Sequence, residues 1–297
     1  MYPLFIVVPI HNAEKYLPDF LATLKKQTYQ QYELVIFDDG SEDDSVNIIM
    51  ELFPRTHILR GDGTCWWSTS VNEGIRFALN NNCELVLTLN VDLVLHKDYL
   101  RNMIIVMNNR KNLILGSAVY DIETRLICDI GANYNWKTAK LSKNIFKLQN
   151  DLSDLKRTNV LGGRGLLIPR NAFELIGLFD QVKLPQYAAD YVFTAKANQN
   201  GFELYCNTKA IIYSYIKNTG ISSFIKRLSF ANFYKYLTHI KSPGNLKVRW
   251  YAARQMVPRK YFIQFIILDL LRVIGGYFKT TIYGNTTSLD LQGRHSS

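Results

Sequence analysis

Several carboxylates in this 297-residue sequence stand at positions where they could hold a cation. Asp38 and Asp39 follow one apolar run, and Asp92 follows another, in the order Asn90-Val91-Asp92. Hard divalent cations such as Mg²⁺ bind a few carboxylate oxygens and complete their shell with the phosphate oxygens of a substrate. A turn or a helix cap is the alternative for these positions, because Asp-Asp-Gly-Ser is favourable turn chemistry.

A further carboxylate, Asp190, has the surroundings of a general base. It lies at the expected start of a helix, within the segment Pro185–Tyr191 and among apolar neighbours. Burial there would raise the pKa of the carboxyl toward that of a working base. A plain N-cap explains the same position equally well, because Asp is a preferred residue at helix starts.

Two other features could contact a substrate. Trp66 and Trp67 carry flat apolar rings that suit stacking on a base or a sugar, with core packing as the alternative. The glycine-rich turn at residues 162–165 could present the backbone of Gly163 and the guanidinium of Arg164 to a diphosphate or an acceptor. A tight turn without a ligand is the alternative for these glycines.

Short apolar runs alternate with helical patterns in the first part of the chain. The runs are Leu4–Pro9, Tyr32–Phe37, His57–Leu59 and Glu84–Leu89. This alternation predicts an α/β fold with a doubly wound, mostly parallel central sheet flanked by helices. In such a sheet the site lies at the carboxyl ends of the strands. We therefore expect Asn12, Asp39 and Asp92 to converge at that edge.

The pattern of the following part is less regular. The elements expected here are strands at Leu113–Val119, Leu166–Pro169 and Phe202–Tyr205, a loop at Asn144–Asn159 and a helix from Asp190 to Asn200. Gly201 would end that helix, because glycine readily adopts the left-handed conformation of a C-cap.

The composition is that of a folded protein. With 47% hydrophobic and 20% charged residues, a disordered chain is excluded. Four scattered cysteines without a Cys-x-x-Cys pair favour reduced, cytosolic thiols. The first residues lack a basic n-region, so we expect no signal peptide.

The net charge of +10 is concentrated toward the C-terminus. Between Tyr215 and Tyr283 there are twelve Lys or Arg residues and a single acid, Asp269. Such a segment is attracted to nucleic acid or to an anionic membrane surface. Its most apolar stretch, Tyr261–Ile274, is expected to be too short and too polar to span a bilayer but suits the interfacial plane. After Gly284 we expect a polar, loose tail.

An ordered set of motifs resembles the GT-A glycosyltransferases of family 2. The motifs are Phe5–Asn12, Phe37–Asp43, Cys65–Ile75, Leu89–Asp92, Gly162–Pro169, Gly177–Asp180 and Tyr187–Gly201. Each motif alone is weak, but in this order they are specific, and they cover about the first two thirds of the chain. The branch that they most resemble comprises bacterial O-antigen and rhamnan-type enzymes, including rhamnosyltransferases.

The resemblance implies a role for each candidate residue. Asp190 would be the catalytic base, and Asp92 would be the ligand of Mg²⁺ or Mn²⁺. Asp39 would accept a hydrogen bond from the nucleotide base. The expected donor-binding residues are Pro9, Asn12, Asp39, Trp67 and Asn90. Asn90 stands where the family's D-x-D motif has an Asp, which leaves one negative charge fewer. Gly163 and Arg164 would contact the acceptor or the diphosphate.

The implied activity is transfer of a sugar, with inversion, from a nucleotide-sugar donor to a hydroxyl of a saccharide acceptor. In this context the acceptor is expected on a polyprenyl diphosphate, in bacterial surface polysaccharide synthesis. The protein is then expected in the cytoplasm, peripheral at the inner face of the cell membrane, with no nucleic acid as partner. Two alternatives remain: a nucleic-acid-binding protein, favoured by the pI of about 9.3, and a nucleotidyltransferase.

Three segments follow from these expectations. Residues 1–213 form a GT-A nucleotide-sugar-binding catalytic domain. Residues 214–283 form a basic, aromatic-rich helical segment that suits a membrane surface, with a solvated helical bundle or an oligomer contact as the alternative. Residues 284–297 form a polar tail.

Overall fold

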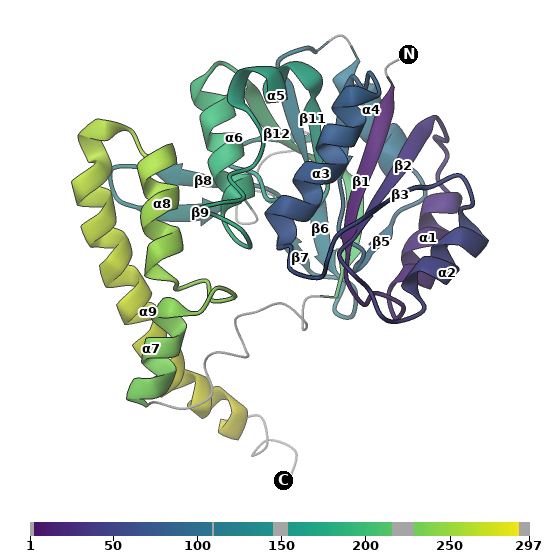
Figure 1. The fold of residues 1–297 in the computed structure, drawn as a ribbon. Coiled ribbons are helices and arrows are strands. Elements are labelled where there is room, and N and C mark those ends of the chain that lie inside the picture. The colour runs from purple at the N-terminus through teal and green to yellow at the C-terminus, as the bar shows by residue number, and fades with distance from the viewer. Residues whose placement is uncertain (1–2, 109, 145–153, 216–228, 291–297) are drawn as a thin grey trace. The chain divides into compact units, whose positions relative to one another are not determined.

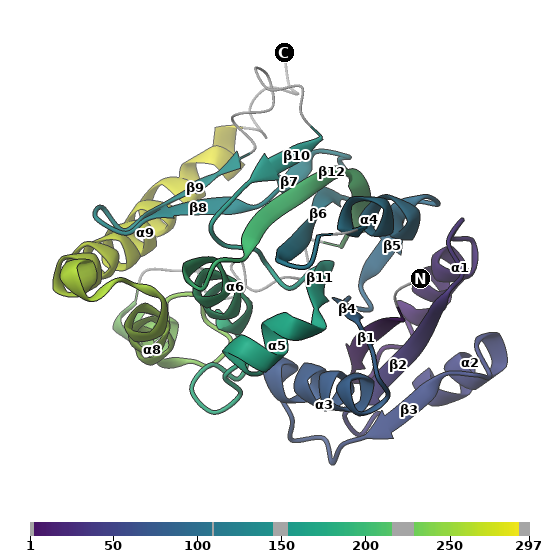
Figure 2. The same cartoon turned by 90° about the horizontal axis from the view of Figure 1, so that it is seen from above.

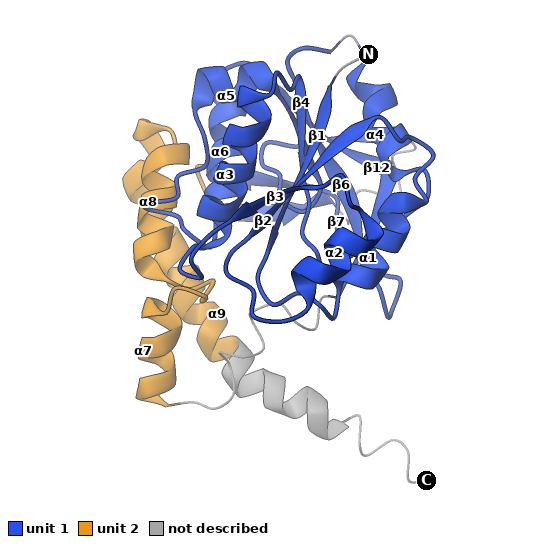
Figure 3. Ribbon diagram, turned by 45° about the vertical axis from the view of Figure 1, so that its right-hand side comes forward, with its two compact units in different colours: residues 1–134, 141–216 blue, residues 135–140, 217–297 orange. Residues whose placement is uncertain are grey.

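The structure is a computed structural model that describes residues 3–108, 110–144, 154–215 and 229–290, with side chains described as far as Lys279. It contains two compact units. Unit 1 comprises residues 1–134 and 141–216, and unit 2 comprises residues 135–140 and 217–297 (Figure 3).

A large mixed sheet forms the centre of unit 1 (Figure 1). Among the described residues its strands are β1 (Leu4–Ile10), β2 (Tyr32–Asp38), β3 (His57–Arg60), β4 (Leu85–Thr88), β5 (Leu93–Leu95), β6 (Leu113–Asp121), β7 (Ile127–Asp129), β10 (Leu155–Arg157), β11 (Leu166–Pro169) and β12 (Glu203–Ser214). The strand order is β10-β12-β6-β11-β4-β1-β2-β3, with β5 on β12 and β7 on β6. A separate two-stranded sheet pairs β8 (Ala132–Asn135) with β9 (Lys140–Lys143).

The centre of this sheet is mostly parallel, as the sequence predicts. Strands β3, β2, β1 and β4 run in one direction, and β6 and β12 also pair in parallel. Strand β11 lies between β4 and β6 and runs antiparallel to both. From β1 to β4 the parallel arrangement arises because a helix connects each strand to the next.

Helices cover both faces of the sheet (Figure 2). One face carries α1 (Leu17–Lys25), α2 (Ser45–Leu52) and α4 (Tyr99–Met107), and the other carries α3 (Trp67–Asn80), α5 (Arg170–Ile176) and α6 (Ala189–Gln199). Alternate residues of β1, such as Ile6 and Val8, join the core under α1, α2 and α4. Val7 points to the opposite face, where a side chain at Gly74 of α3 would collide with it. Glycine therefore allows α3 to lie close to the sheet.

Two elements differ from the sequence expectation. The described end of the expected loop at Asn144–Asn159 contains the strand β10; residues 145–153 lie outside the described residues. The strand expected at Phe202–Tyr205 extends to Ser214 as β12. Its pairing with β6 shifts register between Asn207 and Ile211. The polar residues at this irregularity interrupt the apolar pattern and conceal the full length of the strand.

The described residues of unit 2 beyond Ser229 are mostly helical, and its residues 135–140 lie at the turn between β8 and β9. The helices are α7 (Phe230–Thr238), α8 (Leu246–Met256), the short 3₁₀ helix η3 (Arg259–Tyr261) and α9 (Phe262–Asp290). Tyr236, Val273 and Tyr277 form its small buried cluster. Asp269 is buried and ion-paired with Arg249, so the single acid of the basic segment is neutralised inside the unit.

Helix α9 is longer than the sequence pattern indicates. It continues past Gly284 to Asp290, so the first part of the expected loose tail is helical, while residues 291–297 lie outside the described residues. By length and composition alone, the 21-residue stretch Arg259–Lys279 is long and apolar enough to cross a membrane. The sequence expectation concerned only Tyr261–Ile274, and this longer stretch extends beyond that run on both sides.

Candidate functional site

The carboxyl ends of β1, β2 and β4 lie beside one another at one edge of the sheet. Ile10 pairs with Asp38, and the last residue of β4, Thr88, pairs with Val7. Pro9 therefore lies beyond the final pair between β1 and β4, where its missing N–H removes no ladder hydrogen bond on that side. The chain after each strand end is free to form loops over this edge.

Asp39 is the buried carboxylate at the end of β2. It is only 4% exposed, and its Oδ1 accepts a hydrogen bond from the backbone N–H of Gly63 at 2.9 Å. The first side-chain carbon of any residue at position 61 would lie 2.6 Å from Asp39 Oδ1, so Gly61 keeps the space that this carboxylate occupies. The side chain of Asp39 is thus fixed under the loop that leads into α3, as a group that recognises a ligand must be.

The loops after β1 and β2 are bound to each other by polar side chains. Asn12 has a φ of +49° and is exposed; its Oδ1 accepts from the N–H of Glu42 at 2.9 Å, and its own N–H donates to Ser41 Oγ at 2.9 Å. Asp38 accepts from the N–H of Ser41 at 3.0 Å. Asp38 therefore has the turn role that its sequence allows. The expected contact of Asn12 with a nucleotide stays a prediction beside this loop-bridging role.

Trp67, the first residue of α3, joins two other predicted site residues. Its indole N–H donates to Asn90 Oδ1 at 3.1 Å. A side-chain carbon at Gly163 would lie 2.7 Å from the Trp67 ring, so the ring lies directly against that backbone. The Trp67 ring also packs against the ring of Phe179, and the two ring centroids are 5.4 Å apart. Trp67 thus orients Asn90 and holds the 162–165 turn in place.

Asp190 is the second residue of α6 and lies against the same turn. Its Oδ2 accepts from the N–H of Gly163 at 2.7 Å, and its Oδ1 accepts from the N–H of Tyr191 at 2.8 Å. Burial raises the pKa of the Asp190 carboxyl, while these two backbone donors oppose the rise. Two residues before Asp190, Ala188 has a backbone φ of +70°, a conformation that is strained for alanine. Such strain at a helix start is consistent with a functional site.

Asp92 lies in the connection between β4 and β5 and faces Arg164. Burial raises the pKa of the Asp92 carboxyl, and the positive charge of Arg164 opposes the rise. The structure shows no hydrogen bond or ion pair between the Arg164 guanidinium and another described residue. A cation this close to several carboxylates is suited to bind an anionic ligand.

The residues around Asp92 fit a hard divalent cation bound together with substrate. Asp92 and Asn90 offer one carboxylate and one amide oxygen, and Mg²⁺ is commonly held by one or two carboxylates plus substrate phosphates. A different group, formed by Asp39, Asp62 and Cys65, has potential ligand atoms within 4.8 Å of one another. Burial, together with Asp39, raises the pKa of Cys65 to about 11. The protonated thiol is a poor ligand for Mg²⁺, so we favour Asp92 and Asn90.

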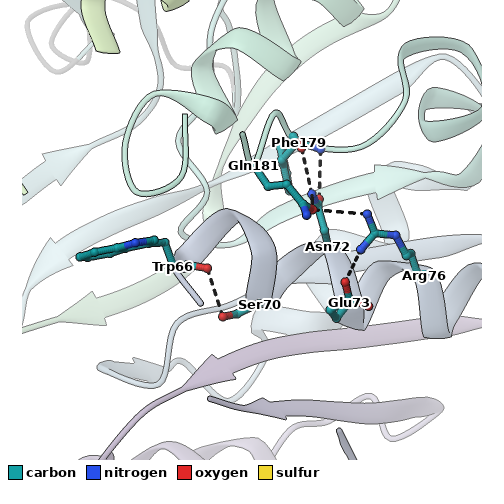
Figure 4. Close-up of polar contacts among 7 residues, drawn as sticks. All are labelled: Trp66, Ser70, Asn72, Glu73, Arg76, Phe179 and Gln181. Atoms are coloured by element: carbon teal, nitrogen blue, oxygen red, sulfur yellow. Dashed lines mark hydrogen bonds and ion pairs between the residues drawn. The ribbon is translucent and has the colours of Figure 1, made fainter. Parts of the chain in front are cut away.

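A polar clamp on α3 holds the segment that leads toward α6 (Figure 4). Asn72 is buried; its amide donates to the carbonyl of Phe179 at 2.9 Å and to Gln181 Oε1 at 2.7 Å, and its oxygen accepts from the N–H of Phe179 at 3.1 Å. Arg76 also donates to Gln181 Oε1, at 3.3 Å. The clamp fixes Phe179 against Trp67. Asn72 belongs to a motif of the sequence, but its partners could not be found without the fold.

Asp129, at the end of β7, is a carboxylate that the sequence reasoning did not select. Burial raises the pKa of its carboxyl, with the charges of Lys143 and Arg164 opposing the rise. Its carboxylate also contributes to the raised pKa of Asp190. The only available signal was an acidic residue at the end of a short strand, which is too common a feature to select on its own.

The described residues thus divide the predicted site into two neighbouring groups. Asp190, Gly163, Trp67 and Asn90 are linked by direct contacts, and Arg164 lies near Asp92. Pro9, Asn12 and Asp39 lie at the ends of β1 and β2. The loop through Cys65 connects the groups. A separate cavity of about 580 Å³, lined by residues such as Leu4, Tyr32 and Thr56, lies at the amino end of these strands; ligands of open parallel sheets bind at the other end.

Comparison with known proteins agrees with this architecture. An uncharacterized glycosyltransferase of Rickettsia prowazekii is 25% identical over 191 residues, 63% of this chain and 55% of the relative. The chain thus spans about half the length of the first curated relatives it matches. A Methanococcus voltae enzyme is 24% identical over 243 residues, 75% of this chain and 69% of the relative; it is a dolichyl N-acetyl-alpha-D-glucosaminyl phosphate 3-beta-D-2,3-diacetamido-2,3-dideoxy-beta-D-glucuronosyltransferase.

Solved structures share the fold at low sequence identity. Residues 1–349 of S. aureus TarS, in complex with UDP-GlcNAc, match with a TM-score of 0.61 and 17% identity, over 98% of this chain and 77% of that one. The mannosyltransferase PcManGT of Pyrobaculum calidifontis, in complex with GDP-Man and Mn²⁺, matches with a TM-score of 0.58 and 13% identity, over 91% and 70%. The fold is therefore the GT-A fold that the sequence motifs indicate.

The strongest assignment comes from the sequence as a whole. The family model described as Glycosyl transferase family 2 matches residues 5–174, more than half of the chain. This range contains Asp39, Trp67, Asn90, Asp92 and the 162–165 turn. The chain belongs to glycosyl transferase family 2.

Proposed function

We propose that the protein transfers a sugar from a nucleotide-sugar donor to a hydroxyl of a saccharide acceptor, with inversion at the anomeric carbon. The observation that carries the proposal is the placement of Asp190. Its side chain is partly buried, is held by the N–H of Gly163, and lies against the turn that packs on Trp67. A partly buried carboxylate of raised pKa is suited to accept a proton.

In the proposed reaction the acceptor oxygen attacks the anomeric carbon while its proton moves to Asp190. The bond between that carbon and the donor phosphate breaks, and its electron pair leaves with the nucleoside diphosphate. Asp39 binds the nucleotide base, and Asp92 with Asn90 holds Mg²⁺ or Mn²⁺. When bound, the cation supplies Lewis-acid stabilisation of the departing diphosphate. Arg164 adds a second positive charge to the same anion.

The substrates are proposed from two kinds of support. The TarS and PcManGT structures hold UDP-GlcNAc, and GDP-Man with Mn²⁺, which favours a nucleotide-sugar donor and a divalent cation. The Methanococcus relative acts on a dolichyl-phosphate-linked sugar, which favours a polyprenyl-linked acceptor. Hexosyl or rhamnosyl transfer in O-antigen-type polysaccharide synthesis rests on the sequence resemblance alone.

A thermal-shift screen of nucleotide sugars with and without Mn²⁺ tests the proposal. A donor present at about 100 times its Kd should stabilise the fold by about 2.7 kcal/mol, or about 5–11 °C for a unit of this size. The donor that binds should then release a nucleoside diphosphate. Release of pyrophosphate would identify a nucleotidyltransferase instead. Absence of a shift with every donor, while mixed oligonucleotides bind, would contradict the proposal.

We also propose that unit 2 associates with the anionic inner face of the cell membrane. The outward side of α9 carries an apolar stripe in which Ile263, Ile267 and Leu271 are 73%, 54% and 61% exposed. The opposite side, with Asp269 and Val273, is buried within the unit. This spacing gives one apolar face along the helix. A helix whose other side packs against its own unit suits the interfacial plane rather than a bilayer crossing.

Positive charge accompanies this stripe. Between Ser229 and Lys279 there are nine Lys or Arg residues, and Asp269 is the single acid of that stretch. Each cation near an anionic leaflet contributes about 1 kcal/mol of attraction, reduced by salt. Trp250, 44% exposed on α8, adds an aromatic side chain suited to the headgroup region. The cytoplasmic leaflet, which carries the anionic lipids, is the surface that matches this charge.

Vesicle sedimentation of the full chain tests the membrane proposal. Ile267→Glu with Leu271→Glu should abolish binding to vesicles that contain phosphatidylserine, since both changes place carboxylates in the apolar stripe. Gln264→Glu adds one negative charge, half that of the double variant, at an exposed polar position of the same helix and should weaken binding only slightly. Equal binding of the two variants would contradict insertion of the stripe.

A further inference from the structure

One position in the fold is surrounded by three groups suited to bind a sugar. A side-chain carbon at Gly162 would lie 3.7 Å from Asp129 Oδ2, 3.7 Å from Tyr191 Cε1 and 3.8 Å from Asp190 Oδ2. With glycine at 162, that position carries no side chain. Two carboxylate oxygens and the edge of an aromatic ring therefore face the same small space, directly beside the proposed base.

Neither the backbone conformation nor a steric clash requires glycine at position 162. No positive φ is found there, and the three distances are those of ordinary van der Waals contact. The neighbouring Gly163 differs, because a side chain there would collide with Trp67. Gly162 thus leaves open a space that an alanine methyl could occupy without strain.

Asp129 is held so that one of its oxygens faces this space. Its Oδ1 accepts from the N–H of Gly131 at 2.9 Å. Gly131 has a φ of +77°, a conformation that glycine adopts readily. Oδ2 is the oxygen that faces Gly162. The charged groups around Asp129 are Lys143 from β9 and Arg164 from the 162–165 turn. They partly balance the two carboxylates, which would otherwise repel each other in a buried site.

We propose that this space is the part of the acceptor subsite next to the base and that Asp129 binds the acceptor hydroxyl adjacent to the one that attacks. The substrate class is a saccharide with two neighbouring free hydroxyls: one gives its proton to Asp190, and the other donates a hydrogen bond to Asp129 Oδ2. The proposal rests on the proposed glycosyl transfer and adds the residue that selects the acceptor.

The distances are compatible with such a bridge. Asp129 Oδ2 and Asp190 Oδ2 are separated by at most the sum of their distances to the Gly162 position, about 7.5 Å. A hydroxyl-to-carboxylate hydrogen bond is about 2.7 Å long. The two carboxylates are therefore close enough for a pair of adjacent hydroxyls to reach both. The ring of Tyr191, which meets Tyr134 edge-on with centroids 6.4 Å apart, offers an apolar wall for the C–H face of the sugar.

Two variants of the full chain test this subsite with methyl hexopyranosides as acceptor probes and the donor found by thermal shift. Gly162→Ala should lower transfer by about 100-fold while the donor-induced thermal shift persists, because the methyl group displaces the attacking hydroxyl from Asp190 without reaching the donor. Asp129→Asn should raise the acceptor KM by about 10- to 100-fold, the typical effect of losing a hydrogen bond to a charged group. Asp154→Asn, an exposed carboxylate paired with Lys209, is the matched control and should change neither quantity.

Two further readouts separate binding of the acceptor from a structural role of Asp129. Loss of the negative charge beside Asp190 should move the acid limb of the kcat/KM profile to lower pH, since that charge helps to raise the pKa of the base. The wild-type chain should also discriminate against deoxy acceptors that lack the second hydroxyl, and Asp129→Asn should lose that discrimination.

The outcomes distinguish the subsite from the proposed function. If Gly162→Ala binds the donor and transfers the sugar at the wild-type rate, the proposed subsite is overturned. The proposed glycosyltransferase activity would then still stand. Persistent discrimination against every deoxy acceptor in Asp129→Asn would also overturn it. A wild-type chain that binds no nucleotide sugar would overturn the proposed function and the subsite together.

Discussion

A methyl group added at Gly163 should strain the contact between the 162–165 turn and Trp67. The new carbon would lie 2.7 Å from Cη2 and Cζ2 of the Trp67 ring, whereas non-bonded carbons are most stable at about 3.5–4.0 Å. The ring cannot move freely, because its indole N–H is bonded to Asn90 and its face packs on Phe179. We expect an overpacking cost of about 1–3 kcal/mol, which lowers the Tm by about 2–12 °C.

Gly162→Ala is the matched comparison for this prediction. The same methyl group one residue earlier meets its nearest atoms at 3.7 Å, so the variant should melt at the wild-type temperature or slightly above it. A Gly→Ala change without strain typically stabilises by about 0.4–1 kcal/mol. Circular dichroism melts give both Tm values, and tryptophan fluorescence reports movement of the ring. Equal melting temperatures for the two variants would refute the inference that Trp67 is fixed against Gly163.

Three other predictions follow from particular contacts. Asn72→Ala should destabilise the fold by about 2–4 kcal/mol, because several buried hydrogen bonds are lost together; urea denaturation measures this, and a change under 0.5 kcal/mol would argue against the clamp. Cys65, whose pKa is raised to about 11 by burial and by Asp39, should react slowly with iodoacetamide at pH 8 and faster as pH approaches 11; rapid labelling at pH 8, found by mass spectrometry, would contradict the burial. Asp269→Asn should cost about 1–3 kcal/mol, less than a fully buried pair because the side chain of its partner Arg249 is 31% exposed; an unchanged melt would show that the pair contributes nothing.

The strand-end carboxylates could be predicted from sequence because their signal is local. Each of the first four apolar runs became a strand, and Asp39 and Asp92 follow two of them. The parallel arrangement then places such positions at one edge of the sheet. The turn at 162–165 and the start of α6 were also predictable, since glycine and the helical pattern mark them. Asp190 was identified by its motif and its apolar neighbours.

The partners of these residues depend on contacts between distant segments, which no local pattern contains. The hydrogen bond from Trp67 to Asn90 and the approach of Asp129 to Asp190 join different strands and helices. The length of β12 was hidden by the polar residues at its register shift, and the length of α9 by the residues beyond its apolar run. A strand continues through such residues because its neighbouring strand supplies the hydrogen bonds, and a helix continues because its hydrogen bonds are internal.

The central claim, that Asp190 accepts the proton of the attacking hydroxyl, is tested most directly by single-turnover transfer with Asp190→Asn and saturating donor. Asparagine cannot take the proton, so transfer should fall by about 10²–10⁴-fold, while the donor-induced thermal shift stays at the wild-type value. Transfer at near the wild-type rate, with the donor bound, would contradict the claim.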